Sequence, residues 1–452
     1  MGKQSIAQKM RIYIHDHMNS FRTILLGFCL LILGGAVLLS MPFASAKGEA
    51  VPFIDALFTS VSASCVTGLV VYDTAVQWSL AGRAIILILI QIGGLGVITL
   101  ATVTLILTGR QIGIMQRTVM QDAISAPQLG GILRLTIFFL KGTLLIEGIG
   151  TALLTPVFAE KYGLLKGFGH AVFHAVSAFC NAGFDLMGAE QPFASLTAWA
   201  GDVRVNLIIM LLIVMGGLGF LTWQDLLRSG GRFSRLALQT KVILATTGAL
   251  LLVPFLYFYF LEFRNVPEGE RLLLAMFQTV TPRTAGFCTT DYAAMSEGGL
   301  LVTIVLMLTG GAPGSTAGGM KVTTVYIVAL SVASFLRRRE NVSCFSRRIE
   351  EETVREAMYI MVLYLGLLFL GTVAVSAAER IPVLPAMFEC ASALGTVGLT
   401  TGITPGLSSF SKIILILFMY AGRVGGLTLA YAMALPGRRE KSRFPVGKVA
   451  VG

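Results

Sequence analysis

Charged residues are scarce in this sequence. Asp, Glu, Lys and Arg together make up 13% of its 452 residues, whereas hydrophobic residues make up 55%. A soluble domain of this length cannot hide so much apolar side-chain surface, because a large part of any folded surface faces water. The composition therefore excludes an ordinary soluble domain and favours a protein that uses lipid as its solvent.

Residues that carry catalytic or metal chemistry are also few. The sequence has four His and six Cys residues, and no two Cys residues form a CxxC pair, so we interpret the cysteines as packing residues. His170 and His174 are spaced like two metal ligands on a helix, but they lack a third ligand nearby, which favours local hydrogen bonding. No residues resemble a nucleophile with its base, which argues against an enzyme, and we expect no organic cofactor.

Long apolar runs are what the sequence has in abundance. A helix needs about 20 apolar residues to cross a hydrocarbon layer of about 30 Å. Runs of this length without any charge are 23–46, 84–109, 205–224, 242–261, 298–320 and 357–378. Two further runs carry charges, namely 135–159 with Lys141 and Glu147, and 413–435 with Arg423. We therefore predict an all-α membrane protein with eight transmembrane helices, in one pore-forming domain over 1–452.

Positive charge gathers in alternate loops. The formal net charge of +11 would by itself fit a nucleic-acid-binding protein. However, 22 of the 35 Lys and Arg residues lie in the segments 1–22, 110–134, 225–241, 337–356 and 436–452. The positive-inside rule assigns such loops to the cytoplasm, so both termini are predicted to be cytoplasmic. Basic and aromatic residues do not cluster as they do on nucleic-acid-binding surfaces, and we expect no nucleic-acid partner.

One short pattern occurs four times. The stretches CVTGLVVYD, SAFCNAGFDL, TPRTAGFCTTD and SALGTVGLTTG centre on Gly68, Gly183, Gly286 and Gly398, at intervals of 115, 103 and 112 residues. Each glycine follows a Phe (58, 173, 277 and 388), and each precedes an apolar run that contains a glycine cluster. Four matches in the same order and at similar offsets indicate an internal repeat.

Each repeat is predicted to contain an outer helix, a short half-helix, a glycine turn and an inner helix. We place the repeats at 21–110, 134–228, 240–339 and 355–436, followed by a cytoplasmic tail at 437–452. A half-helix such as 52–64 covers only about 20 Å at 1.5 Å per residue, too little to cross the membrane. We therefore expect re-entrant hairpins, which protein or a water-filled cavity must surround. Two spans per repeat fit an inverted-repeat transporter poorly.

The four turns can meet around one axis and form a cation site. A cation that loses its water needs oxygen atoms in exchange, and backbone carbonyls supply them in potassium-channel filters. Glycine permits the positive φ that lets successive carbonyls face the axis. The predicted K+-binding filter residues are Val66, Thr67, Gly68, Asn181, Ala182, Gly183, Thr284, Ala285, Gly286, Thr396, Val397 and Gly398.

Acidic residues follow three of the four turns. Asp73, Asp185 and Asp291 lie five, two and five residues after their glycines, whereas the fourth repeat has Thr400 and Thr401 instead. Acids at the outer mouth would raise the local concentration of cations. Each Asp also suits a turn or a helix cap, and the sequence leaves both interpretations open.

These features resemble the membrane subunit of the Trk/Ktr/HKT potassium-transporter superfamily, most closely the KtrB type. The motifs that carry the resemblance are TGL at 67–69, NAGF at 181–184, TAGF at 284–287 and TVGL at 396–399. It implies potassium uptake, because glycine in all four filters goes with K+ selectivity in this family and some sodium-selective plant relatives carry serine in the first. Sodium coupling, shown by some members, is left open.

The resemblance also implies partners and a location. The chain would form a homodimer in the lipid of the bacterial plasma membrane, seated on a cytosolic ring of KtrA/TrkA-like nucleotide-binding regulatory subunits. The basic loop at 337–348 suits a docking surface for that ring and equally a loop that orients the protein in the membrane.

Below the predicted filter, the third inner helix is expected to break. The stretch LTGGAPGSTAGGMK at 308–321 holds five glycines and a proline, and in a helix interior each Gly costs about 1 kcal/mol and Pro about 3 kcal/mol relative to Ala. A phosphate-binding P-loop is disfavoured because Met320 separates Gly319 from Lys321 and no strand precedes. The predicted gate residues in this loop are Gly310, Gly311, Gly314, Ser315, Thr316, Gly318, Gly319 and Lys321.

Arg423 lies near the middle of the last span. It is twelve residues from either end of 411–435, about 18 Å at 1.5 Å per residue, so its side chain cannot reach an interface. An Arg that faces lipid at this depth costs about 3 kcal/mol or more, so Arg423 should face the pore. The resemblance implies that it meets the gate loop, and a packing ion pair without a transport role is the alternative.

Other intramembrane polar residues are given smaller roles. Glu389 and Arg283 are expected to orient the filter backbone, and Asp55 suits the positive end of the first half-helix. Lys141 and Glu147 are expected to pack helices together. Two rival functions stay open: a secondary transporter for another cation or small solute, and a membrane enzyme, which would need a cluster of titratable residues at one depth.

Overall fold

The computed structural model describes residues 20–96, 132–426 and 428. Within these ranges the regular secondary structure is helical apart from one antiparallel hairpin, formed by β1 (Ser343–Cys344) and β2 (Arg347–Arg348), and loops connect the helices. The first 19 residues, residues 97–110 of the first predicted repeat, residues 429–436 of the fourth and the predicted tail at 437–452 lie outside the described residues.

The helices fall into four consecutive groups, which we label I to IV. Group I contains α2 (Ser20–Ser40), η1 (Pro42–Ala44), α3 (Phe53–Ser64), α4 (Thr74–Gln77) and α5 (Leu80–Leu95). Group II contains α8 (Ile132–Tyr162), α9 (Leu164–Phe179), η2 (Thr197–Trp199), α10 (Val203–Gly217) and α11 (Phe220–Ser229), and ends in η3 (Phe233–Arg235). Group III contains α12 (Leu238–Tyr257), the π-helical η4 (Phe258–Glu262), α13 (Glu268–Val280), η5 (Tyr292–Ala294), α14 (Glu297–Leu308) and α15 (Val322–Leu336). Group IV contains α16 (Glu351–Glu379), α17 (Val383–Gly395), η6 (Thr404–Gly406) and α18 (Ser409–Val424).

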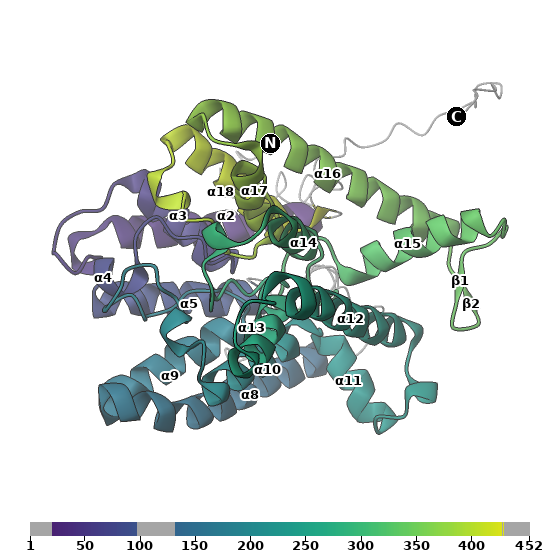
Figure 1. Ribbon diagram of the computed structural model, residues 1–452, viewed down its shortest axis with the longest axis horizontal. Helices are drawn as coiled ribbons and strands as arrows, with labels where there is room; N and C mark the ends of the chain where they lie inside the picture. Colours follow the sequence, from purple (N-terminus) through teal and green to yellow (C-terminus); the bar gives the residue numbers. More distant parts are fainter. Residues whose placement is uncertain (1–19, 97–131, 427, 429–452) are drawn as a thin grey trace, which may run out of the picture.

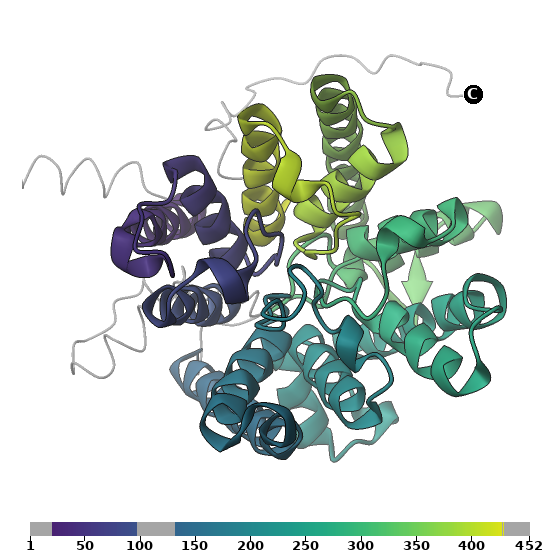
Figure 2. The ribbon, with the colours of Figure 1, turned by 60° about the vertical axis from the view of Figure 1, so that its left-hand side comes forward.

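The four groups surround a common centre. Figure 2 shows them as a ring of purple, blue, green and yellow-green helices, with the turns of the chain converging toward the middle. In Figure 1, α8 and α16 run along opposite sides of the molecule. The short helices α3, α9, α13 and α17 have 12, 16, 13 and 13 residues. At 1.5 Å per residue they are about 18–24 Å long, so the structure contains short helices where half-helices were predicted.

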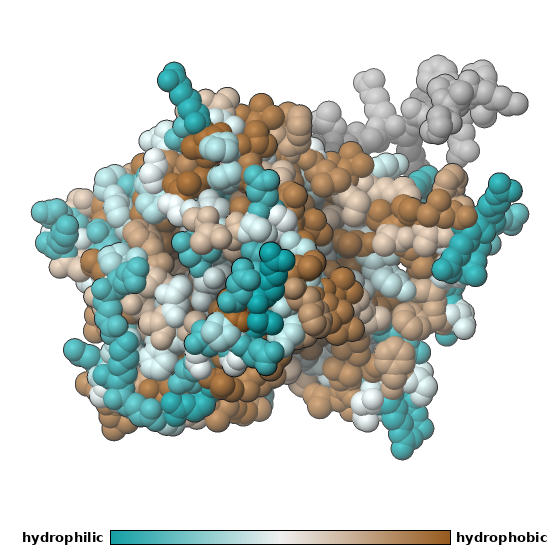
Figure 3. Space-filling model, in the orientation of Figure 1, coloured by the Kyte–Doolittle hydropathy of each residue, from teal (hydrophilic) through white to brown (hydrophobic). Residues whose placement is uncertain are grey.

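The first helix of each group is long enough to cross a membrane. The spans that meet this criterion in the described part of the chain are Arg22–Ser40, Arg134–Tyr162, Leu238–Glu262 and Glu351–Glu379. Their outward side chains are apolar, and Leu30, Leu145, Leu252 and Phe369 are each at least 60% exposed. Figure 3 shows extensive hydrophobic surface, with hydrophilic residues on the β1–β2 hairpin that projects at the right-hand end. Exposed apolar surface of this extent marks contact with lipid.

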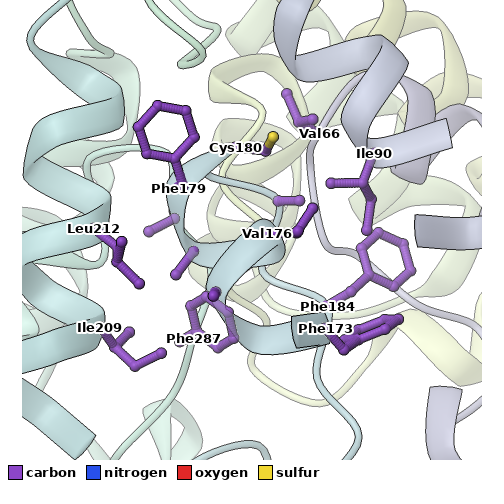
Figure 4. Packing of buried hydrophobic residues seen from close by; sticks show 14 of the residues in the cluster. Val66, Ile90, Phe173, Val176, Phe179, Cys180, Phe184, Ile209, Leu212 and Phe287 are labelled. Carbon is purple, nitrogen blue, oxygen red and sulfur yellow. The ribbon is translucent and has the colours of Figure 1, made fainter. Parts of the chain in front are cut away.

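Buried aromatic side chains fix the short helices. The phenylalanines that precede the four turns are at most 3% exposed: Phe58, Phe173, Phe277 and Phe388. Figure 4 shows how α9 is held, with Ile90 of α5 on one side and Ile209 and Leu212 of α10 on the other. The short helix of group II is therefore packed against its own group and group I, which sets the position of the turn that follows it.

The inner helices of groups I, II and IV, which are α5, α10 and α18, end at or next to a glycine. α10 and α11 meet at 92° across Leu218 and Gly219, so the prediction of one continuous helix over 205–224 is wrong. α5 and α18 end at Gly96 and Gly425. The three glycines share a φ of 86–89° and a ψ of 132–141°. Glycine adopts a positive φ at little cost, so one local conformation explains all three breaks.

A second set of glycines allows the helices of a group to touch. For three glycines of the inner helices, an added Cβ atom would lie 2.0–2.2 Å from a carbonyl oxygen of the short helix: Gly93 against Ser64, Gly216 against Phe179, and Gly422 against Leu394. Such distances are far below a normal van der Waals contact. Only glycine therefore lets the inner helix approach the end of the short helix, directly next to the turn.

Replacing Gly93 by alanine should destabilise the fold. The added methyl group meets backbone rather than a movable side chain, so α5 must shift away from α3, and overpacking of this kind costs about 1–3 kcal/mol. Thermal unfolding of the purified protein in detergent would show a lower midpoint. Gly366→Ala in α16 is the matched control, because nothing lies within 4 Å of its Cβ position. Equal midpoints for the two variants would contradict the packing argument.

Candidate functional site

The four turns that follow the short helices share a pattern of backbone φ angles. In each turn the first and third predicted filter residues have positive φ: Val66 (51°) and Gly68 (93°), Asn181 (58°) and Gly183 (69°), Thr284 (68°) and Gly286 (83°), Thr396 (51°) and Gly398 (94°). Positive φ is uncommon for residues other than glycine. Its occurrence at the same position of all four turns indicates a shared structural constraint.

The four turns touch one another in a closed ring. Each of the four glycines lies against the carbonyl oxygen of the residue just before the corresponding glycine in the next group. The glycine of group IV lies against group I in the same way, which closes the ring. The distances from an added Cβ to that oxygen are 2.5 Å for Gly68 and Ala182, 2.7 Å for Gly183 and Ala285, 2.3 Å for Gly286 and Val397, and 2.1 Å for Gly398 and Thr67. All twelve predicted filter residues are buried. The ring thus brings carbonyl oxygens of all four groups together at one place.

Glu389 holds the segment that leaves the fourth turn. Its carboxylate lies in α17 and accepts hydrogen bonds from the hydroxyls of Thr400 and Thr404, at 2.5 and 2.7 Å, and from the backbone N–H of Thr401, at 3.1 Å. The side chain is fully buried. These contacts match the role expected for Glu389, because they fix the backbone immediately after the turn.

The corresponding residues of groups II and III also contact the segment after their turn, a role that the sequence did not indicate for them. Gln278 in α13 donates to the hydroxyl of Thr289 at 3.0 Å. Nε2 of His174 in α9 accepts from the N–H of Leu186 at 3.4 Å. Like Glu389, both residues come directly after the buried phenylalanine of their short helix. This constant offset was the signal that would have identified them.

The three predicted mouth acids have different surroundings. Asp73 is buried, caps α4, and accepts from the N–H of Phe193 in group II at 2.7 Å. Asp185 is half-buried and accepts from the N–H of Met187 at 2.9 Å. Asp291 is exposed and caps η5. All three therefore act as caps or turn acceptors, the alternative that the sequence had left open beside a role at the mouth.

The loop at 309–321 lies where the break in the third inner helix was predicted. α14 ends at Leu308 and α15 begins at Val322. The loop crosses to two other groups, through hydrogen bonds from the Thr316 hydroxyl to the carbonyl of Phe179 (3.0 Å), from Ala312 N–H to Gly217 (2.9 Å) and from Gly319 N–H to Gly422 (3.1 Å).

The loop also touches the ring and lines a cavity. An added Cβ on Gly318 would lie 2.1 Å from the hydroxyl oxygen of Thr396, a ring residue. Gly310 and Gly311 pack against the loop itself, at Gly318 and Ala317. A cavity of about 830 Å³ lies next to the loop. Five predicted gate residues line it: Gly314, Ser315, Gly319, Lys321 and Arg423. Residues of α2, α12, α15 and α16 complete the lining. The loop therefore lies between the ring and this cavity.

Arg423 joins three segments at this level. Its guanidinium donates to the carbonyl of Thr316 in the loop and to the carbonyls of Gly93 and Gly94 in α5, the last at 2.9 Å. The final carbonyls of a helix carry partial negative charge, which complements a cation. These acceptors are backbone carbonyls rather than a carboxylate, so the alternative of a packing ion pair does not describe the contacts. Lys321 donates to the carbonyl of Ala317 at 2.8 Å.

The remaining candidates have structural surroundings. Nδ1 of His174 lies 2.8 Å from the carbonyl of His170, as local hydrogen bonding requires. Within 20–96, 132–426 and 428, no three His, Cys, Asp or Glu side chains are placed to hold a metal ion. Arg283 donates to the hydroxyl of Thr247 in α12, at 3.4 Å, and this contact lies away from the turn backbone that it was expected to orient. Glu147 accepts from the Gln91 amide at 3.2 Å and joins α8 to α5.

Comparison with known proteins reveals relatives over nearly the whole chain. A family model named TrkH and described as a cation transport protein matches residues 13–442. The potassium/sodium uptake protein NtpJ of Enterococcus hirae is 38% identical, over 98% of this chain and 99% of its own length. The Ktr system potassium uptake protein B of Bacillus subtilis is 38% identical, over 94% of this chain and 95% of its own.

A solved structure shares the fold. The potassium transporter TrkH from Vibrio parahaemolyticus matches 92% of this chain and 84% of its own, with a TM-score of 0.71 and 21% sequence identity. At this identity the likeness concerns the fold alone, and membership rests on the family model and the closer relatives. The chain therefore belongs to the TrkH family of cation transport proteins, and it is a membrane transporter rather than an enzyme.

Proposed function

We propose that this chain mediates potassium uptake across the bacterial plasma membrane, through one pore on the axis of the four turns. The observation that carries the proposal is the closed ring, in which four glycine-centred turns with the same pattern of positive φ touch backbone to backbone. In this pore the carbonyls of the twelve filter residues replace the water around K+. The relatives named as potassium uptake proteins support K+ as the ion.

Eight membrane segments with fourfold pseudosymmetry form the proposed pore domain. The outer segments are α2, α8, α12 and α16, and the inner segments are α5, α10, α14 and α18. The inner helices are short because they end at glycines or at the loop after α14. The basic loops support cytoplasmic termini.

The loop at 309–321 and Arg423 are the proposed gate. Support comes from the contact of the loop with the ring on one side and with the cavity on the other. Asp73, Asp185 and Asp291 are proposed to attract cations to the outer mouth. Asp73 has a second role there, because its carboxylate also joins groups I and II.

The proposed assembly is a homodimer on a cytosolic ring of nucleotide-binding regulatory subunits. The relatives named as parts of a Ktr system support a partner of this kind. The β1–β2 hairpin, with exposed Arg347 and Arg348, is a suitable docking surface because it projects beyond α15 and α16 (Figure 1). Sodium coupling belongs to the proposal only as a variable to test, by measuring uptake with and without Na+.

Uptake of radioactive rubidium by a potassium-transport-deficient host tests the function. The unmodified chain should restore uptake, with K+ as competitor, and Gly68→Ser should lower the preference for K+ over Na+ because its side chain enters the ring. Gly48→Ser is the control, since Gly48 also has positive φ but nothing lies within 4 Å of its Cβ position. Competition by organic solutes would favour the rival secondary transporter, and identical preferences for the two variants would count against the pore.

A further inference from the structure

Groups IV and I meet without a covalent connection. The chain joins groups I to II, II to III and III to IV, so only non-covalent contacts close the ring between the last group and the first. Figure 2 shows the yellow-green helices of group IV beside the purple helices of group I. We call this boundary the seam. Three side chains of α18 cross it: Lys412 to Asp55, Tyr420 to the carbonyl of Leu25, and Arg423 to Gly93 and Gly94.

Lys412 and Asp55 form a buried ion pair across the seam. The distance from Nζ to Oδ1 is 2.7 Å, and the two residues are 9% and 6% exposed. Other ion pairs among the described residues have side chains that are 21–83% exposed, namely Lys161–Glu190, Arg204–Glu160, Arg204–Asp202 and Arg348–Glu351. Exposed pairs contribute little because water and salt screen them, whereas a buried pair strongly opposes separation of its partners.

The position of Lys412 is unfavourable for its own helix. It is the fourth residue of α18, close to the positive end of the helix dipole, where a cation is disfavoured. Asp55 lies in the first turn of α3, where a carboxylate is stabilised. The lysine is therefore explained by its contact across the seam and not by helix formation.

The carboxylate of Asp55 also contacts the segment that leaves the first turn. The Tyr72 hydroxyl donates to Oδ2 of Asp55 at 2.8 Å, and Tyr72 lies four residues after Gly68. The ring contact at the seam, from the Cβ position of Gly398 to the oxygen of Thr67, is the shortest of the four at 2.1 Å. Asp55 thus binds group IV through one oxygen and the exit of the first turn through the other.

We propose that Lys412, Asp55 and Tyr72 form a brace that closes the ring at the seam and thereby sets its preference for K+ over Na+. The inference rests on the proposed function, and the three are positioning residues that do not touch the ion. Lys412 lies ten residues before Gly422, and the residues ten positions before the corresponding glycines Gly93 and Gly216 are Arg83 and Asn206. Arg83 and Asn206 donate to backbone carbonyls of their own groups, at 2.5–3.0 Å and 2.7–3.3 Å.

The double variant Asp55→Leu with Lys412→Met tests the brace. It replaces the pair by apolar side chains of similar volume and leaves no unpaired buried charge, so the fold should persist. In the host assay, the ratio of K+ to Na+ uptake should fall about tenfold, as expected when a charged hydrogen bond that orients a site is lost. Lys412→Arg should preserve most of the ratio, because it keeps the charge and can donate to Asp55.

Arg83→Met is the matched control. It removes a half-buried cation at the same helix offset in α5 without touching the seam, so the ratio should stay at the unmodified value. Tyr72→Phe removes a single hydroxyl and should lower the ratio in the same direction by a smaller factor, independently of whether the double variant folds. An unchanged ratio in Tyr72→Phe, or in a folded double variant, would overturn the brace. Absence of K+ uptake by the unmodified chain would instead overturn the proposed function.

Discussion

Replacing Gly398 by alanine is expected to slow potassium uptake about 100-fold while the protein still reaches the membrane. The added Cβ would stand 2.1 Å from the carbonyl oxygen of Thr67 and 2.9 Å from Cα of Gly68, both of them backbone atoms of the first turn. A left-handed conformation costs about 1–2 kcal/mol for a residue with a Cβ atom, and overpacking costs about 1–3 kcal/mol. A total near 3 kcal/mol corresponds to uptake that is about 100-fold slower.

Gly402→Ala separates the two causes of this loss. Gly402 has a φ of 91°, close to the 94° of Gly398, but nothing lies within 4 Å of its Cβ position. Both variants therefore place an alanine at nearly the same positive φ, and only Gly398→Ala forces the ring apart. Initial rates of rubidium uptake, divided by the amount of protein that elutes as a single peak in detergent, compare them. An equal loss in both variants would assign the effect to strain and would deprive the ring of its role in transport.

The turns could be located from sequence because their cause is local. Glycine permits a positive φ that other residues resist, and it occurs at positions 68, 183, 286 and 398. The similar distance from each glycine to a preceding phenylalanine identifies the helix before the turn. The loop at 309–321 was predicted for a similar reason, since glycine and proline oppose a helix wherever they occur. The positive φ of the first residue of each turn, such as Val66, was not foreseen, because the left-handed residue that ends a helix is usually a glycine.

The broken inner helices show where a hydropathy argument fails. An apolar run reports that a segment prefers lipid or protein to water, and it contains no information about φ. The run at 205–224 carries no charged residue, yet the chain turns by 92° at Gly219. The repeated motif GGLG at 93–96 and 216–219, with GRVG at 422–425, was the available signal. In this alignment Arg423 occupies the place of Gly94 and Gly217.

Contacts between distant segments are the part that sequence reasoning could not supply. Asp55 was correctly placed at the positive end of a helix, but its partner Lys412 is 357 residues away. The cost of burying an Arg in lipid argued that Arg423 faces the pore. In the structure its guanidinium donates to backbone carbonyls of the loop at 309–321 and of α5. The same argument could not name Gly93 and Gly94 as acceptors, because they become neighbours only when group IV closes against group I.

Replacing Arg423 by alanine is expected to raise the rate of potassium uptake and to weaken its regulation. The side chain holds the loop at Thr316 against the end of α5 at Gly93 and Gly94. A hydrogen bond from a charged donor contributes about 1.5–3 kcal/mol, so losing even one raises the population of a displaced loop about tenfold or more. Rubidium uptake at fixed protein level, measured with and without the regulatory partner, gives both quantities.

Arg423→Lys distinguishes a latch from a charge barrier. Lysine keeps the positive charge near the pore, but its single ammonium cannot make the forked contacts of a guanidinium to the loop and α5 together. If the latch limits transport, Arg423→Lys should raise uptake nearly as far as Arg423→Ala. If the positive charge repels K+, the lysine variant should behave like the unmodified protein. Unchanged uptake and regulation in Arg423→Ala would instead assign the residue to helix packing. The loop and α5 would then keep their positions without the hydrogen bonds from Arg423.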